Sequence, residues 1–225
     1  GNKFLANIRE VDAIAHVVRA FEDEKINHVH SRINPAEDIE IINAELILAD
    51  LETVTSRFDK TAKEARASLK QAIIDLKTLE KLKPWLEAGN IISKMELNDE
   101  EARLAKELNL LTAKKFIYVI NVSEEQLMSK WNPFDFADST KLTTSQNKPD
   151  EKLKKVTGNS PYVIMNNKLE LTLSETSTAE RVEYLQEFGL PESGLDNLIK
   201  TGYKALDLLT FLTTGEDETR AWTAH

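Results

Sequence analysis

The hydrophobic pattern of the chain alternates between short apolar runs and longer stretches with helical spacing. Three runs are apolar at nearly every position, at residues 13–18, 116–120 and 162–165. Such runs are typical of strands that are buried on both faces of a sheet. Because helical segments separate them, the pattern predicts an α/β domain with a mainly parallel sheet. Ligands of such sheets bind beyond the carboxyl ends of the strands, which lead here into residues 121–124 and 166–168.

A long helical block separates the first apolar run from the second. It begins near Pro35, and acidic residues follow at once, as a helix N-terminus favours. After an expected break at residues 59–61, a new apolar series advances in steps of three and four residues. This heptad seam predicts a projecting antiparallel helical hairpin, with an ordinary amphipathic core helix as the alternative. The seam comprises Ala62, Ala65, Leu69, Ala72, Leu76 and Leu79.

The remainder of the chain predicts short helices and a terminal hairpin. Residues 208–225 alternate between apolar and polar positions, as a β-hairpin does. No later strand follows to pair with this hairpin, so we expect it to be the first part of a further domain. The predicted helices lie at residues 1–11, 98–109 and 150–156, and over residues 174–206 with an interruption at 189–192.

Composition narrows the class of protein. The chain has 225 residues, of which 41% are hydrophobic and 30% charged, as in globular proteins with a sizeable core. No run approaches the roughly 20 apolar residues of a membrane span, and no signal peptide opens the chain, so a cytoplasmic protein with no membrane partner is predicted. The absence of cysteine excludes disulfides and thiolate metal sites. His28 and His30 lack an evident third ligand, so no metal site is predicted.

Glycine is scarce, and this limits phosphate binding by the chain. Seven glycines stand among 225 residues, less than half the usual share of about 7%. Gly189 and Gly194 have the spacing of a P-loop, but Leu195 and Asp196 follow where a lysine and a serine or threonine should stand. We therefore predict that these 225 residues hydrolyse no nucleotide. No pattern of side chains in the sequence predicts a catalytic residue.

Charge is distributed unevenly along the chain. The net charge is −9, yet residues 57–83 hold eight basic and four acidic side chains and thus carry +4. A basic stripe beside the apolar seam would attract RNA phosphates, and a solvated helix face is the alternative. The candidate RNA or ribosome contacts on this stripe are Lys63, Arg66, Lys70, Lys77 and Lys81.

The loop after the second apolar run contains Asn121 and Glu124 in an N-x-x-E arrangement. The pattern alone carries no weight, because it also occurs at Asn7 and Glu10. Its place at the end of a buried strand is that of a base-recognition loop in a nucleotide-binding fold. A capping box of Ser123 with Gln126 explains part of the loop in purely structural terms, and both interpretations stay open.

Taken in order, these segments resemble one family, the Obg-like ATPases or YchF proteins, which are translation-factor-related P-loop NTPases. The N-x-x-E loop resembles the one that replaces the guanine-reading N-K-x-D of ordinary GTPases, and Pro35 to Leu51 resembles the family's P-x-E-D-I-E-x-I-N-x-E-L helix. The P-loop, switch I and the D-x-x-G motif of that family would precede Gly1, so we expect a piece of a longer protein. The resemblance implies a first G-domain part at 1–56, an inserted helical coiled-coil domain at 57–107, a second G-domain part at 108–207 and the start of a TGS domain at 208–225.

The resemblance also implies a site and its ligands. Guanine presents two donors that the aspartate of N-K-x-D accepts together. The N-x-x-E loop lacks this aspartate, and the resemblance therefore implies binding of ATP in preference to GTP. The family implies Mg²⁺-dependent ATP hydrolysis by the full-length protein, with no tight binding of ATP or Mg²⁺ by these residues alone. It also implies a ribosome or RNA partner for the helical arm, and the rival hypothesis is a non-enzymatic helical adaptor or RNA-binding module. The implied base contacts are Asn121, Val122, Ser123, Glu124, Asn166, Asn167 and Lys168, although the family's second loop usually has small residues where the asparagine pair stands.

Overall fold

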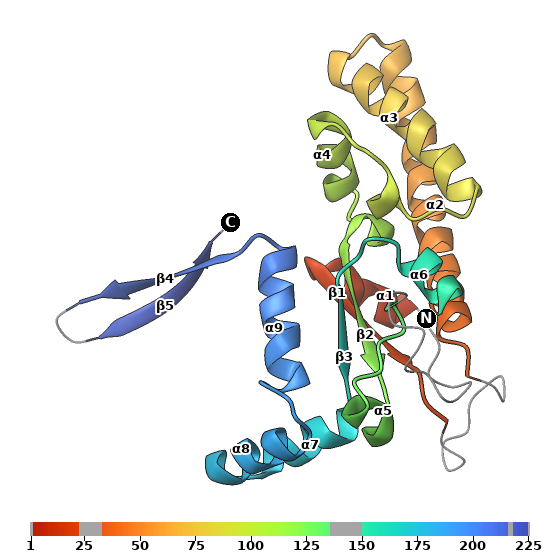
Figure 1. Cartoon of the computed structure of the whole chain (residues 1–225). Helices are drawn as coiled ribbons and strands as arrows, with labels where there is room; N and C mark the ends of the chain where they lie inside the picture. The colour runs from red at the N-terminus through yellow and green to blue at the C-terminus, as the bar shows by residue number, and fades with distance from the viewer. Residues whose placement is uncertain (1, 23–32, 136–149, 216–217, 225) are drawn as a thin grey trace. The chain divides into compact units, whose positions relative to one another are not determined.

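The computed structural model describes residues 2–22, 33–135, 150–215 and 218–224 of the chain (Figure 1). Two compact units account for the fold, and each is assembled from two segments. Gly1–Ile14 and Ile39–Lys115 form the first, here called the helical unit. Ala15–Asp38 and Phe116–His225 form the second, here called the sheet unit. The predicted domain boundaries at 56, 107 and 207 stay a prediction.

A three-stranded sheet holds the order β1 (Ala13–Arg19), β2 (Lys115–Asn121) and β3 (Tyr162–Met165). Strands β2 and β3 are parallel, with Tyr118 opposite Tyr162, and the predicted α/β fold with a parallel sheet is confirmed. Residues 116–120 of the central strand are all buried, as their unbroken apolar run predicts.

Strand β1 departs from the prediction that it is buried on both faces. Val18 is 3% exposed, whereas its neighbour Val17 is 53% exposed. Successive side chains of a strand point to opposite faces of the sheet, and at β1 the face that carries Val18 is covered whereas the face that carries Val17 is open to solvent. The prediction from the apolar run, that this strand is buried on both faces, is therefore wrong.

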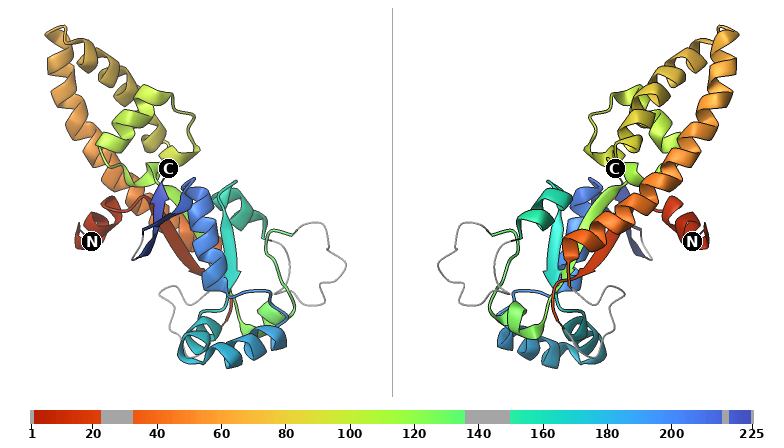
Figure 2. Two further views of the ribbon diagram at one scale, coloured as in Figure 1. Left: turned by 90° about the vertical axis from the view of Figure 1, so that its left-hand side faces the viewer. Right: turned by 90° about the vertical axis from the view of Figure 1, so that its right-hand side faces the viewer.

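The other elements described in the sheet unit are helices, followed by a hairpin at its last residues. Helix α9 packs on β3, as Figure 2 shows. Strands β4 (Leu209–Thr214) and β5 (Thr219–Ala224) form the predicted antiparallel hairpin, and every residue in them is exposed. That this hairpin opens a TGS domain stays a prediction. The helices are α5 (Glu124–Met128), α6 (Glu151–Thr157), α7 (Asn167–Glu175), α8 (Thr178–Glu187) and α9 (Gly194–Ala205).

Two long helices dominate the helical unit and run side by side in opposite directions (Figures 1 and 2). The first, α2 (Pro35–Arg66), begins at the predicted proline, where Asn34 Oδ1 accepts a hydrogen bond from the Glu37 N–H at 3.2 Å. The second is α3 (Lys70–Glu87). The unit is completed by α1 (Asn2–Arg9), α4 (Asp99–Glu107) and two 3₁₀ turns, η1 (Ile92–Lys94) and η2 (Leu111–Ala113).

The helical hairpin is confirmed, but its predicted break at residues 59–61 is wrong. Helix α2 continues through this polar stretch, where Thr61 is only 1% exposed, and the chain reverses at residues 67–69. Ser68 makes the reversal with φ at 62°, a left-handed conformation that non-glycine residues adopt rarely. The seam is therefore shared between two helices, and Leu69 lies in the turn with 55% of its surface exposed.

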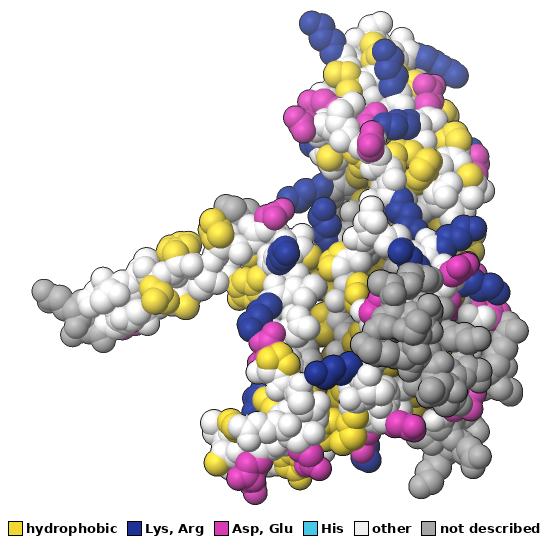
Figure 3. All heavy atoms as spheres, in the orientation of Figure 1, with side chains coloured by type: hydrophobic (Ala, Val, Ile, Leu, Met, Phe, Trp, Pro, Cys, Tyr) yellow, Lys and Arg dark blue, Asp and Glu magenta, His cyan; other side chains and the backbone are white. Residues whose placement is uncertain are grey.

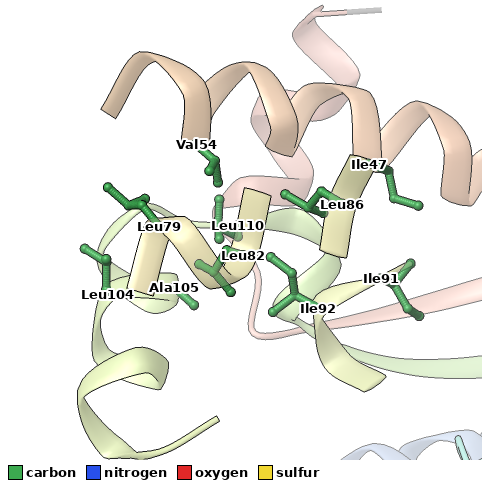
Figure 4. Close-up of a cluster of buried hydrophobic side chains, with 10 residues drawn as sticks. All are labelled: Ile47, Val54, Leu79, Leu82, Leu86, Ile91, Ile92, Leu104, Ala105 and Leu110. Atoms are coloured by element: carbon green, nitrogen blue, oxygen red, sulfur yellow. The ribbon is translucent and has the colours of Figure 1, made fainter. Parts of the chain in front are cut away.

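A hydrophobic cluster joins α2, α3 and α4 (Figure 4). Each of its large side chains contributes about 1.5–3 kcal/mol by burial. The helical unit thus has a continuous core of its own. The buried members are Ile47, Val54, Leu79, Leu82, Leu86, Ile91, Ile92, Leu104, Ala105 and Leu110.

Two buried carboxylates complete the helical unit. Asp50 is 0% exposed and accepts hydrogen bonds from the N–H groups of Leu111 and Thr112, both at 2.8 Å, and from the Thr112 hydroxyl at 2.7 Å. Asp75 is 5% exposed and binds Arg103 at 2.7 Å. These carboxylates tie α2 to the turn before β2 and α3 to α4, because each satisfies several donors away from water.

Candidate functional site

Parallel pairing brings the two predicted loops to one edge of the sheet. Asn121, the last residue of β2, lies opposite Met165, the last residue of β3. Each strand is followed within three residues by a helix, so that α5 and α7 begin at the same end of the sheet (Figure 1). This is the edge at which open α/β sheets bind ligands.

Three hydrogen bonds connect the loops to each other. The Asn167 N–H donates to Asn121 Oδ1 at 3.0 Å. The Asn166 side chain donates from Nδ2 to the Val122 carbonyl at 2.6 Å, and Lys168 Nζ donates to Glu124 Oε1 at 2.8 Å. The structure therefore brings six of the seven predicted base contacts together in direct pairs.

Ser123, the seventh, is engaged within its own loop. Its N–H donates to Gln126 Oε1 at 2.9 Å, and its Oγ accepts from the Gln126 N–H at 3.1 Å. The predicted capping box is thus confirmed. Gln126 also donates from Nε2 to the Ala20 carbonyl at 3.0 Å, a link between β1 and the loop that sequence reasoning missed.

Asn166 positions the second loop. It is 6% exposed, and its Oδ1 caps α7 by accepting from the Leu169 N–H at 2.8 Å. Since its Nδ2 binds Val122, both ends of the amide bind protein atoms. Asn167 and Lys168, which follow it, are exposed and face solvent.

The ion pair between Glu124 and Lys168 lies on the surface of the site. The side chains of Lys168 and Glu124 are 80% and 47% exposed. The hydrogen bond to Glu124 raises the pKa of Lys168 above its ordinary value, so that the ammonium stays charged. Both groups are accessible to a ligand.

Glu170, which sequence reasoning missed, anchors α9 beside the second loop. Its carboxylate accepts from the N–H groups of Gly194 at 2.7 Å and Leu195 at 3.1 Å, two of the donors that have no partner within the helix at its N-terminus.

A side chain at Gly194 would place its Cβ 2.4 Å from Cβ of Met165. Gly189, two residues after the end of α8, has φ at 62°. The two glycines with P-loop spacing therefore have structural roles.

The five basic candidates do not share one helical stripe, and that prediction is wrong. Lys63 and Arg66 lie in the last turn of α2, whereas the others lie on α3 beyond the reversal. Lys81 is engaged, since its ammonium binds Glu101 at 2.7 Å and the Glu96 carbonyl at 2.9 Å. Lys63, Arg66, Lys70 and Lys77 are exposed and form no ion pair with the described residues. Figure 3 shows Lys and Arg side chains, in dark blue, at this end of the hairpin.

Metal binding and membrane insertion find no support in the described ranges. Nowhere in them do three His, Cys, Asp or Glu side chains group as a metal ion would require. None of the helices described here combines the length and hydropathy that a membrane crossing demands. His28 and His30 lie outside the described residues.

Parallel strands with polar loops joined at their carboxyl ends are typical of open α/β proteins that bind a ligand at this edge of the sheet. No family model matches the chain. It is 42% identical over 223 residues to the ribosome-binding ATPase YchF of Bacillus subtilis (strain 168), a match of 99% of this chain and 58% of the relative. The corresponding protein of Escherichia coli O157:H7 is 39% identical over 223 residues, with 99% and 57% covered.

A solved structure agrees with these relatives. The YchF GTPase of Schizosaccharomyces pombe superposes with a TM-score of 0.80 at 31% sequence identity, over 100% of this chain and 58% of that one. By sequence and by fold the chain is related to the YchF proteins, and the resemblance to the Obg-like ATPases is confirmed. The chain spans less than three fifths of the length of the curated relatives it matches.

Proposed function

We propose that the two connected loops bind the base of a purine nucleotide, with ATP preferred to GTP. The observation that carries the proposal is the set of three hydrogen bonds between the loops, at 3.0, 2.6 and 2.8 Å. These bonds hold exposed donors and acceptors in a fixed arrangement before a ligand arrives, which reduces the entropic cost of binding. The names of the relatives, which include ATPase and GTPase, support a nucleoside triphosphate as the ligand.

Hydrolysis is a separate proposal, made for a protein of the relatives' length. The chemistry would be Mg²⁺-assisted transfer of the γ-phosphoryl group to water, which depends on a loop that cradles the phosphates. The 225 residues include no Walker A motif, because Leu195 and Asp196 follow Gly194, the second glycine of the pair with P-loop spacing. We therefore propose that these 225 residues supply base recognition and bind ATP and Mg²⁺ weakly without hydrolysing ATP.

Titration of the ¹⁵N-labelled chain with ATP and with GTP, followed by NMR, tests base recognition. We expect the amide signals of Asn121 and Asn167 to shift and saturate at a lower concentration of ATP than of GTP. Glu124→Asp, which shortens the carboxylate toward the aspartate of N-K-x-D loops, should narrow this preference. Glu125→Asp, at the neighbouring exposed position, is the matched control. Equal or tighter binding of GTP by the unaltered chain would contradict the proposal.

We propose a second function for the end of the helical hairpin, contact with the ribosome. Relatives of the chain are named ribosome-binding, and Lys63, Arg66, Lys70 and Lys77 are free to meet RNA phosphates. Lys81 contributes less, because it is already bound to Glu101. With this function we also propose a cytoplasmic location for the protein.

Co-sedimentation with ribosomes at low salt tests this contact. The triple charge reversal Lys63→Glu, Arg66→Glu and Lys70→Glu should reduce the bound fraction several-fold. A control with equal charge change reverses Lys152, Lys155 and Lys204, which are exposed in the sheet unit. Unchanged sedimentation of the first variant would contradict the proposal. If the unaltered chain sediments with ribosomes but responds to neither nucleotide, the helical adaptor is favoured instead.

A further inference from the structure

We infer that Lys168, through its ion pair with Glu124, determines the preference of the site for adenine over guanine. The inference rests on the proposed base-binding function and names the group that reads the base. It assigns to Lys168 a contact with the ligand in addition to its contact with the protein.

Asn121 recognises a feature that both purines share. Its Oδ1 already accepts from the Asn167 N–H, whereas its Nδ2 has no partner among the described residues, so the amide meets a ligand mainly through this donor. The acceptor that such a donor meets on the exposed edge of a purine is N7, and adenine and guanine both have it. Asn121 therefore favours purines without distinguishing between them.

The backbone between Asn121 and Glu124 offers little further choice. The Val122 N–H donates to the Met165 carbonyl at 2.9 Å, and the Val122 carbonyl accepts from Asn166. The N–H and hydroxyl of Ser123 are both engaged in the capping box. The Val122 carbonyl keeps a second lone pair, but Val122 is buried, so the exposed side chains of Glu124 and Lys168 are left to discriminate between the bases.

The ion pair presents one acceptor beside one donor. Lys168 occupies Oε1 of Glu124 at 2.8 Å, which leaves Oε2 as an acceptor, and the ammonium keeps two N–H groups to donate. Adenine presents the N6 amino donor beside the N1 acceptor, which matches this pair when Glu124 faces position 6 and Lys168 faces position 1. Guanine reverses both groups, because it presents the O6 acceptor and the N1–H donor at these positions. The carboxylate would then face an acceptor, and the ammonium would face a donor.

The exposure of the pair makes it suitable for ligand contact and for mutation. With side chains 80% and 47% exposed, Lys168 and Glu124 reach a base without rearrangement of the loops. Exposed ion pairs contribute little to folding stability, so removal of Lys168 should leave the fold intact. The Asn166 and Asn167 bonds still join the loops in its absence.

The test measures the ratio of the GTP and ATP dissociation constants by NMR titration of the 225-residue chain. In this ratio the contributions of the phosphates cancel. Lys168→Gln should lower the ratio about two- to fivefold, the effect of losing one exposed charged contact. Lys168→Arg, which keeps a cation beside Glu124, should retain most of it. Lys200→Gln is the matched control, because it breaks the ion pair with Glu192 elsewhere in the sheet unit.

Two further readouts separate base reading from a merely structural ion pair. Rising salt should lower the ratio in the unaltered chain and not in Lys168→Gln, because salt screens exposed ion pairs. Inosine triphosphate, which has the N1–H of guanine and lacks its 2-amino group, should bind as weakly as GTP. Inosine triphosphate that binds as tightly as ATP would contradict the match at N1.

The outcomes distinguish the inference from the proposed function. A preference for ATP that persists undiminished in Lys168→Gln overturns the inference and leaves base recognition by the loops in place. Absence of saturable shifts with either nucleotide in the unaltered chain overturns both. A preference that falls in Lys168→Gln and also in Lys200→Gln shows an effect of net charge and overturns the inference alone.

Discussion

Asp50 and Asp75 of the helical unit and Glu124 of the sheet unit are carboxylates in opposite environments. In the helical unit Asp50 and Asp75 are 0% and 5% exposed and bind backbone and arginine donors of the same unit. In the sheet unit Glu124 lies at the surface and shares an ion pair with Lys168, which is itself largely exposed. Burial thus separates these two acidic groups, which stabilise the fold, from Glu124, which a ligand can reach.

Apolar side chains show a parallel difference. The helical unit buries a cluster that extends from Ile47 to Leu110. In the sheet unit α8 and α9 contain no buried residue, and Leu195 and Ile199 of α9 are about half exposed. Local stability follows the density of buried contacts, so the helical unit should open less readily than the last helices of the sheet unit.

The largest expected effect comes from Asp50. Asp50→Asn places an amide donor against the Thr112 N–H and hydroxyl, so that buried donors lose their acceptor. The free energy of unfolding should fall by about 2–4 kcal/mol, measured by urea denaturation. Glu52→Gln, at an exposed position of the same helix, is the control. A loss no greater than that of the control would refute the distinction between buried and exposed carboxylates.

Gly194 offers the next largest effect, within the less densely packed unit. Gly194→Ala brings a methyl group within 2.4 Å of Met165 Cβ and 2.9 Å of Glu170 Oε1. We expect a loss of about 1–3 kcal/mol in thermal or urea unfolding. Gly202→Ala on the same helix meets only an ordinary contact at 3.9 Å and should gain up to about 1 kcal/mol, since alanine is the better helix former. Similar effects of the two variants would contradict the packing of α9 on β3.

The pH dependence of stability sharpens the role of Asp50. Burial raises the pKa of Asp50 above its ordinary 3.8, and the N–H groups of Thr112 and Leu111 offset only part of the rise. The folded state therefore holds the proton more tightly than the unfolded state. The corresponding stability is present at low pH and is lost as the pH rises through the folded pKa. The stability difference between the unaltered chain and Asp50→Asn should accordingly shrink as the pH is raised above 3.8.

Lys81 supplies the smallest expected effect and compares engaged with free cations. Its ion pair with Glu101 is partly exposed, so Lys81→Gln should cost about 0.2–1 kcal/mol in urea unfolding. Because Lys81 is already bound, the same change should alter ribosome co-sedimentation less than Lys63→Glu alone. A larger effect of Lys81→Gln than of Lys63→Glu on sedimentation would contradict the distinction between the engaged Lys81 and the unengaged Lys63.

The sequence predicted the meeting of the two loops better than it predicted the helical hairpin. The loops at residues 121–124 and 166–168 followed from their place after apolar runs, because parallel strands end at one edge of a sheet. The reversal at Ser68 escaped prediction, since no glycine or proline marks it and the three-and-four spacing of apolar residues continues across it. Polar residues near Thr61 suggested a break, but the threonine is buried in the helix.

Contacts that join distant segments of the chain could not be predicted from the sequence either. Gln126 was recognised as half of a capping box, but its bond to the Ala20 carbonyl spans 106 positions. Glu170 caps a helix that begins 24 positions later, and no local pattern distinguishes it from other exposed acids. Such contacts depend on tertiary packing, which periodicity and turn chemistry do not encode.

The division of each unit between two segments has a consequence for how the chain acquires its structure. The chain passes from one unit to the other after Ile14, after Asp38 and after Lys115. During synthesis the pair α2 and α3 can form early from neighbouring residues, whereas Asp50 must wait for Leu111 and Thr112 to emerge. The sheet unit waits longer, because β1 gains its neighbour β2 only after the whole helical hairpin has been made.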